Sequence, residues 1–134
     1  MKQKTEIYYD EAGDMLEVFI GKPVEGYFQE IENGIFIRKS EKEDKLIGFM
    51  MFSLKKRLEK HLNVAYDKTR DILEINLGMG KEKYQKELGE GVFVHIDKKT
   101  EKVIGFMIEA FKRRIINLNF HEMPIEEPSL SIYL

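Results

Sequence analysis

Four aspartates are the residues whose type and spacing come closest to a chemical motif: Asp10, Asp14, Asp67 and Asp71. Each pair follows a tyrosine and precedes a strand-like apolar run. Paired carboxylates can bind a divalent cation or exchange protons. A hard cation, however, needs about six oxygen ligands, and aspartate in such short polar links commonly accepts hydrogen bonds from nearby backbone N–H groups. The sequence therefore favours turn formation, predicts no cofactor, and leaves the four aspartates as alternative metal candidates.

The segment that contains the first pair recurs 57 residues later. Ile7 to Arg57 aligns with Val64 to Arg114 without a gap. Because the offset holds without a gap, we interpret this as an internal duplication. Units of about 57 residues are marginal alone, so we expect the two copies to share one core. The expected arrangement is a pseudodimer about a pseudo-two-fold axis.

The apolar pattern of each copy predicts an α+β fold that is mainly antiparallel β, with two β-β-β-β-α repeats. The expected units are repeat 1 (1–62), repeat 2 (63–116) and a C-terminal extension (117–134) that docks on the body or on a partner. Residues 27–31 fit an edge segment, whereas residues 78–84 read as a loop. The predicted core comprises Leu16, Val18, Ile35, Ile37, Ile47, Phe49, Leu73, Ile75, Val92, Val94, Ile104 and Phe106.

Two local features add to this prediction. Gly48 and Gly105 interrupt equivalent strands, which indicates a bulge or the close approach of another group. Ser53 is placed to cap a helix over 54–62, in which Leu54, Leu58 and Leu62 share one face.

Composition narrows the possible functions. The chain has 134 residues, a formal net charge of -2 and no cysteine, so disulfides, thiolate metal sites and a cysteine nucleophile are excluded. No apolar run approaches the roughly 20 residues that span a bilayer. We expect a cytoplasmic protein with no membrane partner, and the abundance of Lys and Glu leans toward a thermophilic source.

Residues retained in both copies outline a candidate ligand-binding groove between the repeats: Glu17, Glu74, Tyr9, Tyr66, Tyr27 and Tyr84. Across a pseudo-two-fold axis these side chains could line one shared groove. A belt of surface ion pairs is the simpler interpretation, since surface charges are mostly solvated or paired.

The cations and histidines give weaker signals. Two basic clusters, Lys55, Lys56, Arg57 and Lys112, Arg113, Arg114, could contact phosphate. The negative net charge and the lack of a recognition helix favour a solvated helix face, so a nucleic-acid partner is not expected. His95 and Asp97 could form part of a metal site, but no third ligand has a recognisable spacing. We expect His95 to lie at the surface.

The motifs together resemble the family designated domain of unknown function 2283. The resemblance rests on Tyr9-Asp10, Asp14, Leu16, Gly34-Ile35 and Ile47-Gly48, and on Tyr66-Asp67, Asp71, Leu73, Gly91-Val92 and Ile104-Gly105. The acidic residue that the family often carries after the last glycine is absent. The resemblance implies a small β-rich module, antitoxin-like in some members, and brings no catalytic residues.

The expected function is a non-enzymatic protein-interaction or regulatory module, with another protein or a second copy as its partner. The alternative is a small-molecule or metal-binding protein, conceivably an enzyme, with its site between the repeats. The sequence contains no phosphate-binding glycine loop, nucleophile elbow or His-Glu-x-x-His motif.

Overall fold

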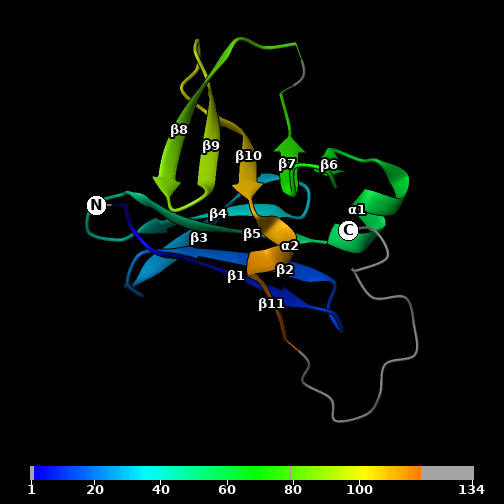
Figure 1. Ribbon diagram of the computed structural model, residues 1–134. Coiled ribbons are helices and arrows are strands. Elements are labelled where there is room, and N and C mark those ends of the chain that lie inside the picture. Colours follow the sequence, from blue (N-terminus) through cyan, green and yellow to red (C-terminus); the bar gives the residue numbers. More distant parts are fainter. Residues whose placement is uncertain (1, 79, 119–134) are drawn as a thin grey trace.

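Two β-sheets make up most of the molecule. The computed structural model describes residues 2–78 and 80–118 (Figure 1). Sheet A has six strands in the order β11-β1-β2-β5-β4-β3, and sheet B has five in the order β6-β7-β10-β9-β8. The strands of sheet A are β1 (Thr5–Asp10), β2 (Met15–Ile20), β3 (Gly26–Glu32), β4 (Ile35–Ser40), β5 (Leu46–Phe52) and β11 (Ile115–Leu118). Those of sheet B are β6 (Val64–Asp67), β7 (Ile72–Asn76), β8 (Lys83–Gly89), β9 (Val92–Asp97) and β10 (Val103–Glu109).

Helix α1 (Leu54–Lys60) links the sheets, and α2 (Phe111–Arg114) leads from β10 into β11. All pairings within the sheets are antiparallel except β1 with β11, which is parallel and joins Ile7 to Ile115. The last strand in the second half of the chain thus completes the sheet formed by the first half. Mainly antiparallel β structure with few helices confirms the predicted fold class at this level.

The core lies between the two sheets, whose strands cross at a steep angle (Figure 1). Inward-facing residues of both sheets form one cluster with Leu54, Leu58 and Phe111 of the helices. Every residue of the predicted core is buried, because strict alternation leaves one apolar face on each strand. Phe49 and Phe106 meet across the sheets with ring centroids 3.8 Å apart and planes inclined by 19°.

Gly48 and Gly105 confirm the prediction of a close approach. A Cβ on Gly48 would lie 2.4 Å from the carbonyl oxygen of Val18, and one on Gly105 would lie 2.6 Å from that of Ile75. The strand register shifts between Arg38 and Lys39 and between Val103 and Gly105. Only a residue without a side chain allows these neighbouring strands to pair so closely.

Substituting Gly48 tests this account. We expect Gly48→Ala to lower the free energy of unfolding by about 2 kcal/mol, because the backbone must shift to admit the methyl group. Gly13→Ala is the matched control, since its nearest contact is a side-chain oxygen of Asp10 at 3.2 Å and not a backbone atom. Equal losses in denaturant unfolding of the two variants would contradict the close approach as the cause.

Three sequence-based predictions need correction. Each half contributes five strands to its sheet, not four, because β3 is a full strand and β8 begins within the segment 78–84 that was expected to be a loop. The first helix ends at Lys60, so Leu62 lies outside it and is exposed. Ser53 has a left-handed backbone and makes no side-chain capping bond. The second helix has only four residues before β11 begins.

The C-terminal extension is described only in part. Residues 117 and 118 belong to β11. The predicted docking of 119–134 lies outside the described residues.

Candidate functional site

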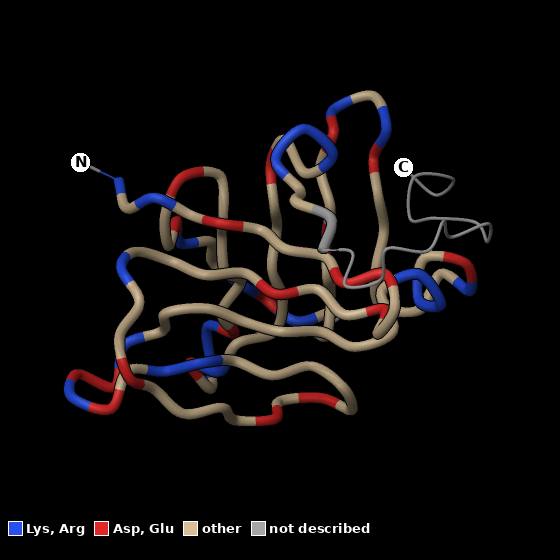
Figure 2. The backbone as a smooth tube through the Cα atoms, turned by 90° about the horizontal axis from the view of Figure 1, so that it is seen from below, with Lys and Arg blue, Asp and Glu red and all other residues tan. Residues whose placement is uncertain are grey.

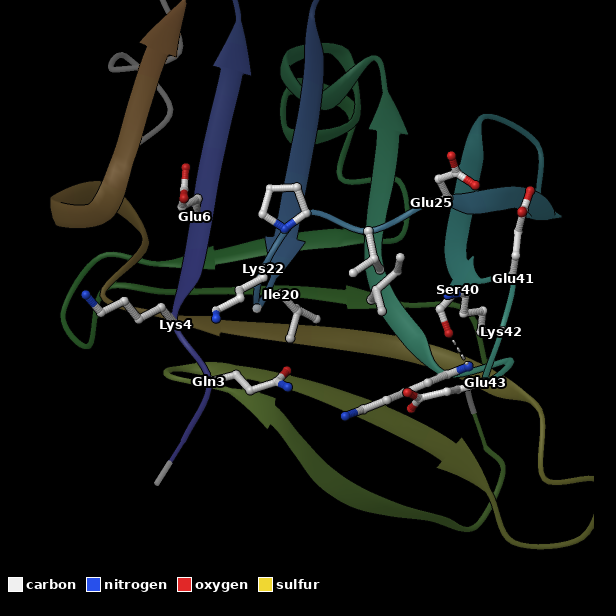
Figure 3. Close-up of a pocket in the computed structure, with 15 residues that line it drawn as sticks. Gln3, Lys4, Glu6, Ile20, Lys22, Glu25, Ser40, Glu41, Lys42 and Glu43 are labelled. Atoms are coloured by element: carbon white, nitrogen blue, oxygen red, sulfur yellow. Dashed lines mark hydrogen bonds between the residues drawn. The ribbon is translucent and has the colours of Figure 1, made fainter.

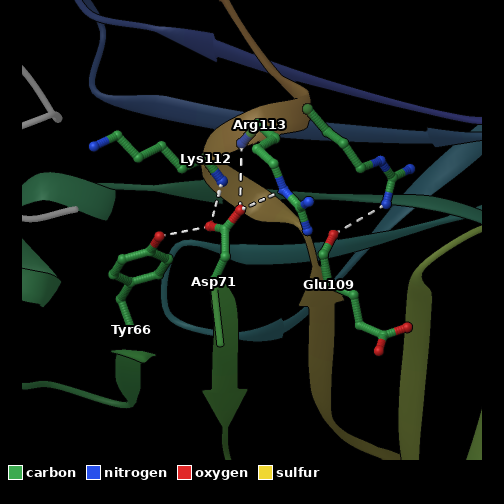
Figure 4. Close-up of polar contacts among 6 residues, drawn as sticks. Tyr66, Asp71, Glu109, Lys112 and Arg113 are labelled. Atoms are coloured by element: carbon green, nitrogen blue, oxygen red, sulfur yellow. Dashed lines mark hydrogen bonds and ion pairs between the residues drawn. The ribbon is translucent and has the colours of Figure 1, made fainter. Parts of the chain in front are cut away.

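Asp14 and Asp71, the second aspartates of the two pairs, each cap a helix that lies far away in the sequence. Asp71 accepts hydrogen bonds from the backbone N–H groups of Lys112 (2.8 Å) and Arg113 (3.4 Å) at the start of α2. The Tyr66 hydroxyl donates to the same carboxylate at 2.5 Å, and Arg113 Nε approaches it at 3.3 Å (Figure 4). The carboxylate therefore takes the place of the missing N-cap side chain of α2.

Asp14 has the same role in the first half. It accepts hydrogen bonds from the N–H groups of Lys55 (2.7 Å) and Lys56 (3.4 Å), and Tyr9 donates its hydroxyl at 2.7 Å. Asp14 and Asp71 both have positive φ angles, 50° and 56°, a conformation that aspartate tolerates better than most residues. Each Tyr–Asp pair thus connects, through hydrogen bonds, a β-hairpin to the helix that follows the same sheet in the chain.

Asp10 and Asp67 have the local turn role that the sequence favours. Asp10 accepts the N–H of Ala12 at 3.1 Å, and Asp67 accepts those of Thr69 and Arg70. Both carboxylates therefore order the turn that follows them.

Tyr66 is held in its neutral form by this arrangement. Burial, followed by the hydrogen bond to Asp71 and the charges of Asp71 and Asp67, raises the pKa of Tyr66 to about 12. For Asp71, burial acts to raise the pKa, but the hydrogen bonds from Tyr66, Lys112 and Arg113 outweigh it and lower the pKa below the usual value.

We expect the raised pKa of Tyr66 to make stability fall above pH 10. The folded protein retains the Tyr66 proton after the unfolded chain, with its ordinary pKa of 10.0, has lost it, so unfolding becomes more favourable as pH rises toward 12. Denaturant unfolding at pH 9 to 12, compared between wild type and Tyr66→Phe, measures this. A variant with the same pH slope as wild type would contradict the assignment.

The structure does not bring together the six residues of the predicted groove. Tyr9 is buried on the inner face of sheet A, whereas Glu17 lies on the outer face, paired with Tyr8 and Met50. Glu74 lies on the outer face of sheet B, between the buried Leu73 and Ile75. Tyr27 and Tyr84 lie on the edge strands β3 and β8, where their hydroxyls donate to Asp44 and Glu101.

His95 is buried, not at the surface as expected. Its Nε2 lies 3.0 Å from Gln85 Oε1, and its ring occupies the space that Gly105 leaves open. Burial and the nearby charge of Lys83 lower its pKa, against a smaller opposing effect of Glu74. Asp97 is buried as well and accepts the N–H of Lys99. Within residues 2–78 and 80–118, no group of three or more potential ligands could hold a metal ion.

The arginines of the two basic clusters stabilise turns. Arg57 donates to the carbonyl oxygens of Phe52 (2.9 Å) and Asn33 (2.6 Å). Arg114 donates to the carbonyl of Glu109 at 3.2 Å and to the Thr5 hydroxyl. Arg113 pairs with Asp71. The three arginines among the predicted phosphate-contacting cations thus have structural partners.

A cavity of about 1000 Å³ opens at one end of sheet A, between the loops that follow β2 and β4 (Figure 3). Ile20, Val24 and Ile47 provide apolar walls, and lysines and glutamates of both loops surround them. At the corresponding end of sheet B, Gly78 packs against Ile104, and Lys81 pairs with Asp97 at 3.6 Å.

The outer face of sheet A is unusually aromatic. We define this aromatic face by the outward side chains of Tyr8, Phe19, Phe28, Phe36, Met50 and Phe52. Phe36 makes edge contacts with Phe28 and Phe52, and Tyr8 makes one with Phe19. Phe28 is 51% exposed and Phe52 39%. Contiguous exposed apolar surface of this kind commonly marks an interaction site. Figure 2 views the molecule from the sheet A side.

Sheet B differs at four of the six equivalent outward positions. Ala65, Asn76, Gln85 and Glu109 stand where sheet A has Tyr8, Phe19, Phe28 and Phe52, whereas Phe93 and Met107 match Phe36 and Met50. Because the fold accepts non-aromatic residues at four of these positions in sheet B, the aromatic residues there in sheet A are not needed to form a sheet. The differences between outward positions of the two aligned segments are the sequence signal that points to this face.

The comparison with known proteins gives one match. The family model described as "Protein of unknown function (DUF2283)" matches residues 63–112, from the residue before β6 into α2. This segment, less than half of the chain, is similar to that family, and residues 1–62 fall outside the match. No curated protein and no solved structure matches the chain. Among the described residues, no helix has the length and apolar character needed to cross a membrane.

Proposed function

We propose that the protein is a non-enzymatic protein-interaction module whose contact surface is the aromatic face of sheet A. The observation that carries this proposal is the ring cluster in which the half-buried Phe36 contacts the exposed Phe28 and Phe52. Aromatic residues supply much of the binding energy at protein interfaces. A regulatory module of this kind acts by occupying its partner, which requires no catalytic residues of its own.

Site-specific photocrosslinking tests the proposal. A photoreactive phenylalanine at position 28 of the full chain, expressed in the source organism, should give a crosslinked adduct of defined mass. The matched control places the same group at position 85, the equivalent site on sheet B. No adduct from position 28, or equal adducts from both positions, would contradict the proposal.

We also propose that the two halves are copies of one ancestral unit, related by a pseudo-two-fold axis. Strands β3, β4 and β5 have the same lengths as β8, β9 and β10, at the 57-residue offset. Asp14 and Asp71 make equivalent capping bonds. Phe49 and Phe106 occupy equivalent positions and stack on each other, as residues near a two-fold axis do. Superposition in an experimental structure by translation rather than a half-turn would contradict this.

A second candidate function is small-molecule binding in the cavity beside Ile20 and Ile47. Its volume falls in the range of ligand pockets, about 300–1,000 Å³. Filling it with Val24→Trp should abolish binding of any ligand found by screening. Retained binding would place the ligand elsewhere.

A further inference from the structure

We infer that the aromatic face of sheet A receives a basic amphipathic helix of another protein. The inference rests on the proposed function and adds the chemical identity of the partner. Three features of the face carry it: its apolar rows, a hollow beside Phe19 and Arg38, and an excess of acidic side chains.

The apolar side chains form rows across the strands. One row runs through Ile116, Tyr8, Glu17, Met50, Phe36 and Glu30, each paired in register with the next. Six strands span about 24 Å at the usual strand spacing, which is close to the length of a helix of about 18 residues. The row is therefore long enough to cover one face of such a helix.

A hollow lies beside the neighbouring row. That row runs through Glu6, Phe19, Gly48, Arg38 and Phe28. The hollow is a pocket of about 230 Å³, lined by Tyr8, Phe19, Lys22 and Arg38 among others. One large apolar side chain of a partner fits a pocket of this size, and such buried anchors dominate interface energetics.

The charges on the face are mainly negative. Glu6, Asp10, Glu17 and Glu30 lie outward on β1, β2 and β3, against Arg38 alone among the outward residues of these strands and β4 and β5. Arg38 is already engaged, since it donates to the Val24 carbonyl at 3.0 Å and lies 5.9 Å above the Phe28 ring. Opposite charge steers association and suppresses wrong partners, so the complementary surface carries Lys or Arg.

The same charges disfavour two occupants supplied by this chain. Residues 119–134 contain Glu122, Glu126 and Glu127 and no Lys or Arg. A second copy that presents the same face would set acidic residues against acidic residues. An extended segment is also disfavoured, because a sheet face offers side chains and no free backbone groups. A helix satisfies its own backbone and needs only an apolar stripe.

Peptide binding to the full chain tests the inference. One peptide is a helix of about 18 residues with a Leu stripe flanked by Lys, and the other has the same stripe flanked by Glu. We expect the Lys peptide to form a 1:1 complex at least about tenfold tighter than the Glu peptide at low salt, since each exposed pair contributes modestly but several act together.

Two pairs of variants locate the peptide-binding site. Phe28→Gln with Phe52→Glu installs the residues of sheet B. This double change should lower the affinity for the Lys peptide by about 30-fold or more, because aromatic anchors are lost. Glu17→Lys should lower that affinity about fivefold, whereas Glu74→Lys, at the equivalent position of sheet B, should leave the affinity unchanged. Binding that survives the Phe28/Phe52 change would overturn the inference.

The remaining outcomes separate this inference from the proposed function. Equal binding of both peptides, lost in the Phe28/Phe52 variant, would overturn the basic partner and support the interaction face. A dimer of the chain that dissociates in the same variant would also overturn the basic partner and support the interaction face, with a second copy of the chain as its occupant. No peptide binding together with no adduct from position 28 would overturn both.

Discussion

Phe106→Ala is expected to destabilise the protein by about 4 kcal/mol. Phe106 is fully buried and stacks on Phe49 of the other sheet at 3.8 Å, so its removal leaves a cavity at the centre of the core. Truncations of buried phenylalanine cost about 3–5 kcal/mol, a large part of the 5–15 kcal/mol typical of a domain. Denaturant unfolding measures the loss.

Two controls define what this result means. Phe93→Ala removes a half-buried ring from the outer face of sheet B and should cost less, because solvent can fill the space. The double variant Phe49→Ala/Phe106→Ala should lose less than the sum of the single variants, since the rings share one contact. Strict additivity would show that the stack does not couple the sheets.

Asp71→Ala is expected to cost about 3 kcal/mol. The change removes a helix cap, worth about 0.5–2 kcal/mol, and leaves the Tyr66 hydroxyl without its acceptor, at about 1–3 kcal/mol. It also puts alanine at a positive φ of 56°, which aspartate and asparagine tolerate better. Asp71→Asn should therefore lower the free energy of unfolding by about half as much, and Glu74→Gln on the next strand should hardly change it.

The cost of Asp71→Asn should depend on pH. The lowered pKa of Asp71 means that the folded protein keeps this carboxylate ionised at a pH where the unfolded chain, with a pKa near 3.8, is protonated. The wild-type advantage is therefore complete above pH 3.8 and disappears as the pH falls through the lower folded value. A constant difference between pH 7 and pH 2 would contradict the role of the charge.

Alternating apolar residues allowed most of this fold to be predicted. The inward face of β2 is defined by Leu16 and Val18, and that of β7 by Leu73 and Ile75. Pairing with β5 and β10 reinforces these two faces. Strand β8 was missed because Lys83–Gly89 is polar, and a strand at the edge of a sheet is determined by its neighbour β9 more than by its own propensity.

The candidate site was harder to predict because it depends on long-range contacts. Asp14 looked like a local turn residue, yet the N–H groups that it accepts are 41 and 42 residues away. His95 looked exposed because nothing near it in the sequence reveals that Gly105 leaves room beside it. The strand pairings established that Tyr8, Phe28 and Phe52 lie on one side of sheet A.

The parallel pairing of β1 with β11 affects how the protein is made. Ile7 and Ile115 are 108 residues apart in the sequence, and contacts between such distant residues form slowly. During translation the outer edge of β1 therefore stays open while sheet B is still emerging from the ribosome. The nascent first half has a free strand edge next to an aromatic surface for that interval, which makes this the stage at which the chain is most prone to wrong associations.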